Sequence, residues 1–68
     1  MLRFNREKIL PLFLSRGITM QELGRLAEVH ATSAKRAING ARVTAPVIGR
    51  VARALRINAL DYLLDEKD

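Results

Sequence analysis

The sequence predicts an all-α fold, a compact five-helix domain that spans residues 1–68. Apolar residues recur at spacings of three and four along most of the chain, and no segment alternates as a half-buried strand would. Residues that favour helix ends punctuate this pattern, with Asn5, Thr19 and Asn58 at predicted starts and Gly17 and Gly40 at predicted stops. A chain of this length has room for one small hydrophobic core, so we expect a single domain.

The first predicted helix begins after Asn5, whose side chain can cap it, and ends at about Ser15. The residues expected to face inward are Ile9, Leu12 and Phe13. Pro11 lies inside this helix. It lacks a backbone donor and its ring clashes with the carbonyl of Glu7, so we expect a kink or a split helix there.

The second predicted helix has the clearest start. Thr19 is its cap, and Glu22, three residues later, completes a capping box in which each side chain accepts from the other residue's amide. The helix should end near Glu28-Val29. Its inward stripe is predicted to be Leu23, Leu26 and Ala27.

A third helix is predicted from Ala31 to Ile38, followed by Asn39-Gly40, which favour a left-handed exit. Its inward residues are expected to be Ala34, Ala37 and Ile38. Its outer face would carry Thr32, Ser33, Lys35 and Arg36. This face is therefore small, polar and basic.

The rest of the chain predicts two more helices. One begins near Ala45, where Pro46 is tolerated because first-turn amides have no partner within the helix. Its predicted core stripe is Val47, Val51, Ala54 and Leu55. Asn58 would cap a short last helix whose apolar face holds Leu60, Leu63 and Leu64.

Charge is distributed unevenly along this basic chain, whose net charge is +5. Residues 31–58 contain six lysines and arginines and no acidic residue, whereas residues 59–68 contain four acidic residues and one lysine. Such a separation suggests a polyanionic partner on one face. On charge alone, a solvated basic surface is an equally good interpretation.

The residue inventory argues against several classes of function. With no cysteine and a single histidine, His30, we expect no disulfide, no metal site and no cofactor. No apolar run approaches the roughly 18 residues of a membrane span, so we expect no membrane partner. No paired carboxylates and no nucleophile with a base are evident, which argues against an enzyme. We expect a cytoplasmic binding protein.

The second and third predicted helices, at about 19–29 and 31–38, have the spacing of a helix-turn-helix unit with a tight turn at Glu28 to His30. Two helices can cross this closely only where their facing residues are small. The small residues available are Gly24, Ala27, Ala34 and Ala37. Val29 would fill the corner of the turn.

The run from Ile18 to Gly40 resembles the helix-turn-helix of the lambda-repressor-like superfamily, which includes the Cro/CI (XRE) regulators and the lac-repressor headpieces. The positions that match are Ile18, Thr19, Glu22, Leu23, Val29, Arg36, Asn39 and Gly40. Residues 51–57 and 60–64 are similar to the family's fourth and fifth helices. Three positions depart from the pattern: Met20 replaces a phosphate-contacting glutamine, Gly24 an alanine, and Glu28 a glycine.

The resemblance implies a sequence-specific transcriptional regulator of bacteria or phages. Such a regulator would bind double-stranded DNA at a palindromic operator, as a homodimer associated with the nucleoid in the cytoplasm. By position, the base-reading residues would be Ala31, Thr32, Lys35 and Arg36. The phosphate-contacting residues would be Gln21, Ser33, Asn39, Gly40, Arg42 and Thr44. The dimer interface would be Leu60, Tyr62, Leu63 and Leu64.

Arg36 is the strongest candidate, because a guanidinium can bind guanine O6 and N7 with two hydrogen bonds, worth about 1–3 kcal/mol of discrimination. The alternative interpretation is that Arg36 is a solvated charge on the surface of the helix. We expect the arginines at 50, 53 and 56 to be a solvated face rather than a second DNA contact. A protein-interaction module on the same fold, such as an antitoxin-like or anti-repressor partner, is the alternative function, and the surplus leucines, including Leu10 and Leu14, favour it.

Overall fold

The computed structural model describes residues 1–64, which form a strand-free helical domain within that range. Its elements are α1 (Arg6–Ser15), α2 (Met20–Ala27), α3 (Ala31–Ile38), α4 (Ala45–Leu55) and a 3-10 turn, η1 (Ala59–Asp61). The acidic residues Asp65, Glu66 and Asp68 lie outside the described residues. The described part of the chain is therefore all-α, with four α-helices rather than five.

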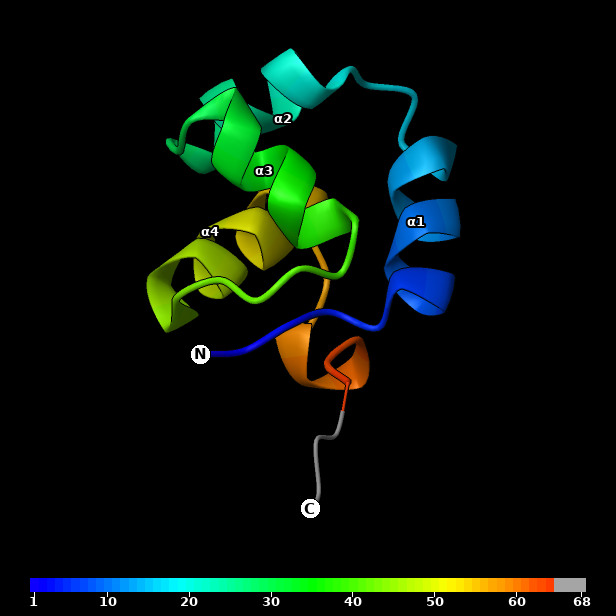
Figure 1. The fold of residues 1–68 in the computed structure, drawn as a ribbon. Coiled ribbons are helices and arrows are strands. Elements are labelled where there is room, and N and C mark those ends of the chain that lie inside the picture. Colours follow the sequence, from blue (N-terminus) through cyan, green and yellow to red (C-terminus); the bar gives the residue numbers. More distant parts are fainter. Residues whose placement is uncertain (65–68) are drawn as a thin grey trace.

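The helices enclose one hydrophobic core (Figure 1). α2, α3 and α4 pack against one another, and α1 stands beside α3 with the amino-terminal segment passing below the loop between α3 and α4. The buried apolar residues are Phe4, Ile9, Phe13, Leu23, Ala27, Ala34, Ala37, Ile38, Val43, Ile48, Val51, Ala52 and Leu55. All four α-helices contribute to this core, as do Phe4 before α1 and Val43 before α4, so no α-helix can be removed without exposing it.

α1 begins as the sequence predicts, with Asn5 Oδ1 accepting a hydrogen bond of 3.1 Å from the Glu7 amide. The helix continues without interruption through Pro11, whose side chain is exposed, so the helix is not split. Ile9 and Phe13 are buried. They lie four residues apart on one face, which fixes α1 against the core.

The predicted capping box of α2 is present. Thr19 Oγ1 accepts from the Glu22 amide at 3.0 Å, and Glu22 Oε1 accepts from the Thr19 amide at 2.8 Å. Hydrogen bonding to the Glu22 carboxylate by Thr19, above all by its backbone amide, lowers the pKa of Glu22, because it favours the charged form. α2 ends at Ala27, slightly before the predicted end, because Glu28 adopts a left-handed conformation with φ of 60°.

Two predicted core stripes are partly wrong. Leu26 was expected inside but is 60% exposed, because α3 and α4 cover only the side of α2 that carries Leu23 and Ala27. In α4 the buried stripe is Ile48, Val51, Ala52 and Leu55, whereas the predicted Val47 and Ala54 are only half-buried. Val51 and Leu55 are buried as predicted, and the stripe keeps the three- and four-residue spacing but is completed by Ile48 and Ala52.

The predicted last helix is a single 3-10 turn. Asn58 Oδ1 accepts from the Leu60 amide at 3.1 Å, as a cap would, but the helical hydrogen bonds then stop. The following backbone pairs with the amino-terminal segment instead: Asn5 donates to the Tyr62 carbonyl at 2.7 Å, and Leu64 donates to the Arg3 carbonyl at 3.0 Å. Backbone groups used in this pairing cannot also continue a helix.

The amino-terminal segment is paired on its other side as well. Leu2 and Val43 exchange two backbone hydrogen bonds of 2.9 and 2.8 Å in an antiparallel bridge. Phe4, almost fully buried, forms a second bridge with Leu63. Residues 2–5 therefore fasten the loop before α4 to the end of the described chain. No helix within residues 1–64 is long and apolar enough to cross a membrane.

The capping box generates a stability prediction. Replacing Thr19 with alanine removes the hydroxyl that accepts from the Glu22 amide and should cost about 0.5–2 kcal/mol of unfolding free energy. For a domain of this size, that corresponds to a fall of about 4–8 °C in melting temperature per kcal/mol. Thermal unfolding followed by circular dichroism measures it.

Thr44→Ala is the matched control, because Thr44 precedes α4 but its side chain makes no capping hydrogen bond. Its melting temperature should stay close to that of the unsubstituted chain. Equal losses in the two variants would show that the Thr19 hydrogen bond contributes nothing specific.

Candidate nucleic-acid interface

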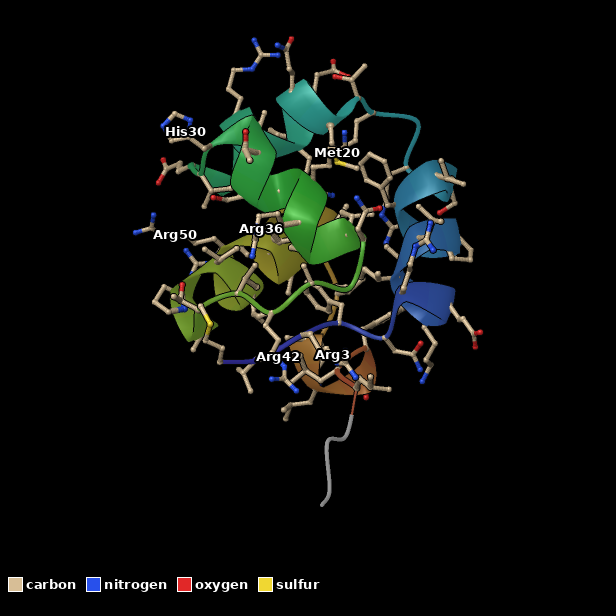
Figure 2. The ribbon with its side chains drawn as sticks, in the orientation of Figure 1. Arg3, Met20, His30, Arg36, Arg42 and Arg50 are labelled. Carbon is tan, nitrogen blue, oxygen red and sulfur yellow. The ribbon has the colours of Figure 1, made fainter. Side chains whose placement is uncertain are left out.

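α3 has one face in the core and one face in solvent. Ala34, Ala37 and Ile38 are buried, whereas Thr32, Lys35 and Arg36 on the other side are exposed. Figure 2 labels Arg36 on α3, where its side chain is exposed. The short inward side chains let α3 pack closely on the core, and the long outward side chains extend into solvent.

The close approach of α2 to the start of α3 depends on Gly24. A Cβ at this position would lie 3.0 Å from the Val29 carbonyl oxygen and 3.1 Å from the Ala31 Cα. These neighbours are backbone atoms, which cannot rotate away as a flexible side chain could. The absence of a side chain at Gly24 therefore sets how closely the turn before α3 packs on α2.

The turn between the two helices is held by backbone hydrogen bonds. The Val29 amide donates to the Gly24 carbonyl at 2.9 Å, which closes the end of α2. The Arg50 guanidinium of α4 donates to the Glu28 carbonyl at 3.2 Å. His30 occupies the cap position of α3 but makes no capping hydrogen bond with its side chain. α4 thus braces the turn that orients α3.

The exit of α3 uses the predicted glycine. Gly40 has φ of 82°, a conformation that other residues resist, and the Ala41 amide donates to the Arg36 carbonyl at 3.0 Å. In the loop that follows, Val43 is buried while Arg42 and Thr44 on either side of it are exposed. The buried Val43, which pairs with Leu2, holds the loop in place and leaves its two neighbours exposed.

The structure brings most of the predicted DNA-contacting residues onto α3 and the loop after it. Of these, Thr32, Lys35, Arg36, Asn39, Arg42 and Thr44 are exposed, and Ala31, Ser33 and Gly40 are half-buried. Gln21 is exposed on the first turn of α2. Met20, by contrast, is half-buried against the core.

The four residues predicted to form a dimer interface differ in how exposed they are. Leu60 is 77% exposed and Leu64 is 37% exposed. Tyr62 and Leu63 are instead half-buried against the core of the same chain. Lys8 Nζ lies 6.0 Å from the centre of the Tyr62 ring and donates to the Asp61 carbonyl. Of these four residues, Leu60 and Leu64 therefore remain exposed to meet a second copy.

Two cationic residues next to this surface were not singled out by the sequence. The antiparallel pairing of Leu2 with Val43 places Arg3 opposite Arg42 across the bridge, and Figure 2 shows both at the same end of the molecule. Arg6 lies beside the end of α3, because a Cβ on Gly40 would come within 3.1 Å of the Arg6 Cβ. The basic residues at 3 and 6 were visible in the sequence, but no spacing rule says that residues 2–5 return to the loop before α4.

The face formed by α3 and its following loop is basic, since residues 31–58 contain no carboxylate side chain. Among residues 1–64 no group of three or more histidine, cysteine, aspartate or glutamate side chains could hold a metal ion. The arrangement offers guanidinium, ammonium, hydroxyl and amide donors on the exposed face of a helix and on the loop that follows it. This set suits an anionic ligand with hydrogen-bond acceptors.

The crossing at Gly24 can be tested by adding the missing methyl group. Gly24→Ala forces the backbone of residues 29–31 to move and should destabilise the chain by about 1–3 kcal/mol, despite the gain of up to about 1 kcal/mol in helix propensity. Chemical denaturation with urea measures the change.

Gly49→Ala is the matched control. Gly49 lies inside α4, and a Cβ there would have no atom within 4 Å, so alanine should stabilise the chain by up to about 1 kcal/mol. Opposite signs for the two variants support the account of the crossing, and stabilisation by both would refute it.

Comparisons of the chain with protein-family models, with curated proteins and with solved structures find no match. The resemblance to the lambda-repressor-like superfamily therefore rests on the residues of this sequence alone.

Proposed function

We propose that this chain is a sequence-specific, double-stranded DNA-binding transcriptional regulator that reads the major groove with α3. The observation that carries the proposal is the exposed, acid-free face of α3, with Thr32, Lys35 and Arg36 directed outward. An α-helix fits the major groove, where each base pair presents its own pattern of donors and acceptors. α2 and α3 then act as a helix-turn-helix of the kind found in lambda-repressor-like regulators.

In this mechanism different residues perform different tasks. Arg36 donates two hydrogen bonds to a guanine, and the Thr32 and Ala31 methyl groups pack against thymine methyls or nearby base edges. Lys35 reaches the groove or its rim. Donors from Gln21, Ser33, Asn39, Gly40, Arg42 and Thr44 contact phosphates, which fixes the position of α3 without reading sequence.

A single copy reads a short half-site, so we propose that two copies bind a palindromic operator with half-sites about one helical turn, roughly 34 Å, apart. The exposed leucines at 60 and 64 supply the apolar contact between copies. A regulator bound in this way would repress transcription wherever its operator overlaps a promoter.

A protein-interaction module is the second candidate function. Leu14 and Leu26 are 66% and 60% exposed on α1 and α2, away from the residues assigned to DNA. Exposed leucines on helices can form the centre of a protein–protein contact. Salt-insensitive binding to a protein, without retention on a DNA column, would favour this function over the first.

Two arginine variants test the assignment of roles. After a preferred duplex has been selected from a random pool, Arg36→Ala should reduce the preference for it over other duplexes by about 1–3 kcal/mol. Arg42→Ala should weaken binding to all duplexes by a similar factor, because a phosphate contact does not depend on sequence. Fluorescence anisotropy titrations at fixed salt measure both.

If Arg36→Ala leaves the preference intact, α3 is not the reading helix in the way proposed. Selection that enriches no sequence at all would contradict the regulatory function itself.

A further inference from the structure

The hollow between the start of α1 and the end of α3 has no role in the proposed function so far. Its volume is about 380 Å³. The residues that line it are Arg3, Phe4, Asn5, Arg6, Glu7, Asn39, Gly40 and Leu64. Asn39 and Gly40 belong to the predicted phosphate contacts, so the hollow opens directly beside that part of the surface.

We propose that this hollow binds a backbone phosphate of the DNA duplex bound by α3, and that Arg6 and Arg3 are the cationic residues that contact this phosphate. The inference rests on the proposed function, since it needs a duplex lying along α3. It extends the contact surface from the loop after α3 to the amino-terminal segment and the first turn of α1.

The backbone that carries both arginines is held in position before any ligand binds. Arg3 is half-buried, its carbonyl accepts from the Leu64 amide at 3.0 Å, and the residue before it is paired with Val43. Arg6 is the first residue of α1, and its Cβ packs closely on Gly40. Ordering a flexible arm costs conformational entropy on binding, and a segment fixed in this way avoids most of that cost.

The position of the hollow fits a phosphate better than a base. α3 ends at its edge, and in Figure 1 the end of α3 lies between α1 and the loop that leads to α4. A duplex whose groove receives the middle of α3 passes one of its backbones across the end of the helix. Contacts made there set position and affinity but do not depend on the base sequence.

One residue of the hollow opposes an anion. Glu7 is exposed and lines the same space as Arg3 and Arg6. A phosphate in the hollow would be repelled by the Glu7 carboxylate and attracted by the two guanidinium groups. Substitutions within this one hollow should therefore change DNA binding in opposite directions. Removing an arginine charge should weaken binding, and removing the Glu7 charge should strengthen it.

The test measures binding of a short, labelled duplex of mixed sequence by fluorescence anisotropy, between about 50 and 200 mM salt. Arg6→Gln should weaken binding about three- to tenfold and reduce the slope of log affinity against log salt by about 0.9, the value for one phosphate contact. Glu7→Gln should tighten binding by about two- to threefold at the lowest salt. Sequence preference should not change in either variant.

Arg53→Gln is the matched control for charge. Arg53 is exposed on α4 and lines a separate hollow with Leu26 and Arg50. Its substitution therefore removes the same charge as Arg6→Gln does, but from another part of the surface. Its salt slope should equal that of the unsubstituted chain. Circular dichroism at the temperature of the titration verifies that each variant is folded.

The outcomes separate the two proposals. If the unsubstituted chain binds DNA and Arg6→Gln behaves like Arg53→Gln, the proposed phosphate site is wrong and the function of α3 stands. If Glu7→Gln weakens binding, the proposed phosphate site is also wrong. If the unsubstituted chain does not bind DNA, both proposals fail.

Discussion

Because Gly24 has no side chain, the backbone of the turn before α3 can lie against α2, and the placement of α3 with one face exposed depends on that approach. A Cβ at Gly24 would meet backbone atoms of Val29 and Ala31 at 3.0–3.1 Å. The Arg50 guanidinium holds the same turn from the side of α4. α3 is thereby fixed at its start, and its small inward residues, Ala34 and Ala37, let it sit deep enough to bury Ile38.

The other end of α3 is fixed by residues distant in the sequence. Leu2 pairs with Val43 in the loop before α4, and Phe4 pairs with Leu63. These contacts make the amino-terminal segment part of the support for the basic surface rather than a free arm. A small domain gains little from its core alone, so backbone pairing at the periphery contributes to holding the loop in one place.

Local signals in the sequence were enough to predict much of the fold. The caps at Asn5 and Thr19, the limits of α3 and the left-handed Gly40 were all predicted, because each depends on residues within one turn. The exposure of Leu26 and the end of the helical pattern after Asp61 were not, because both depend on which distant segments pack there. For the same reason the positions of Arg3 and Arg6 beside the end of α3 required the structure. The outward face of α3 needed only helical periodicity.

The most direct test of the central claim is to map amide chemical shifts of the isotope-labelled chain as duplex DNA is added. The account predicts that the largest changes fall on residues 31–36 and 39–44, with smaller ones at residues 3 and 6 and at Gln21. Changes concentrated around Leu26 and Arg53 instead, or no change at any residue at low salt, would contradict it.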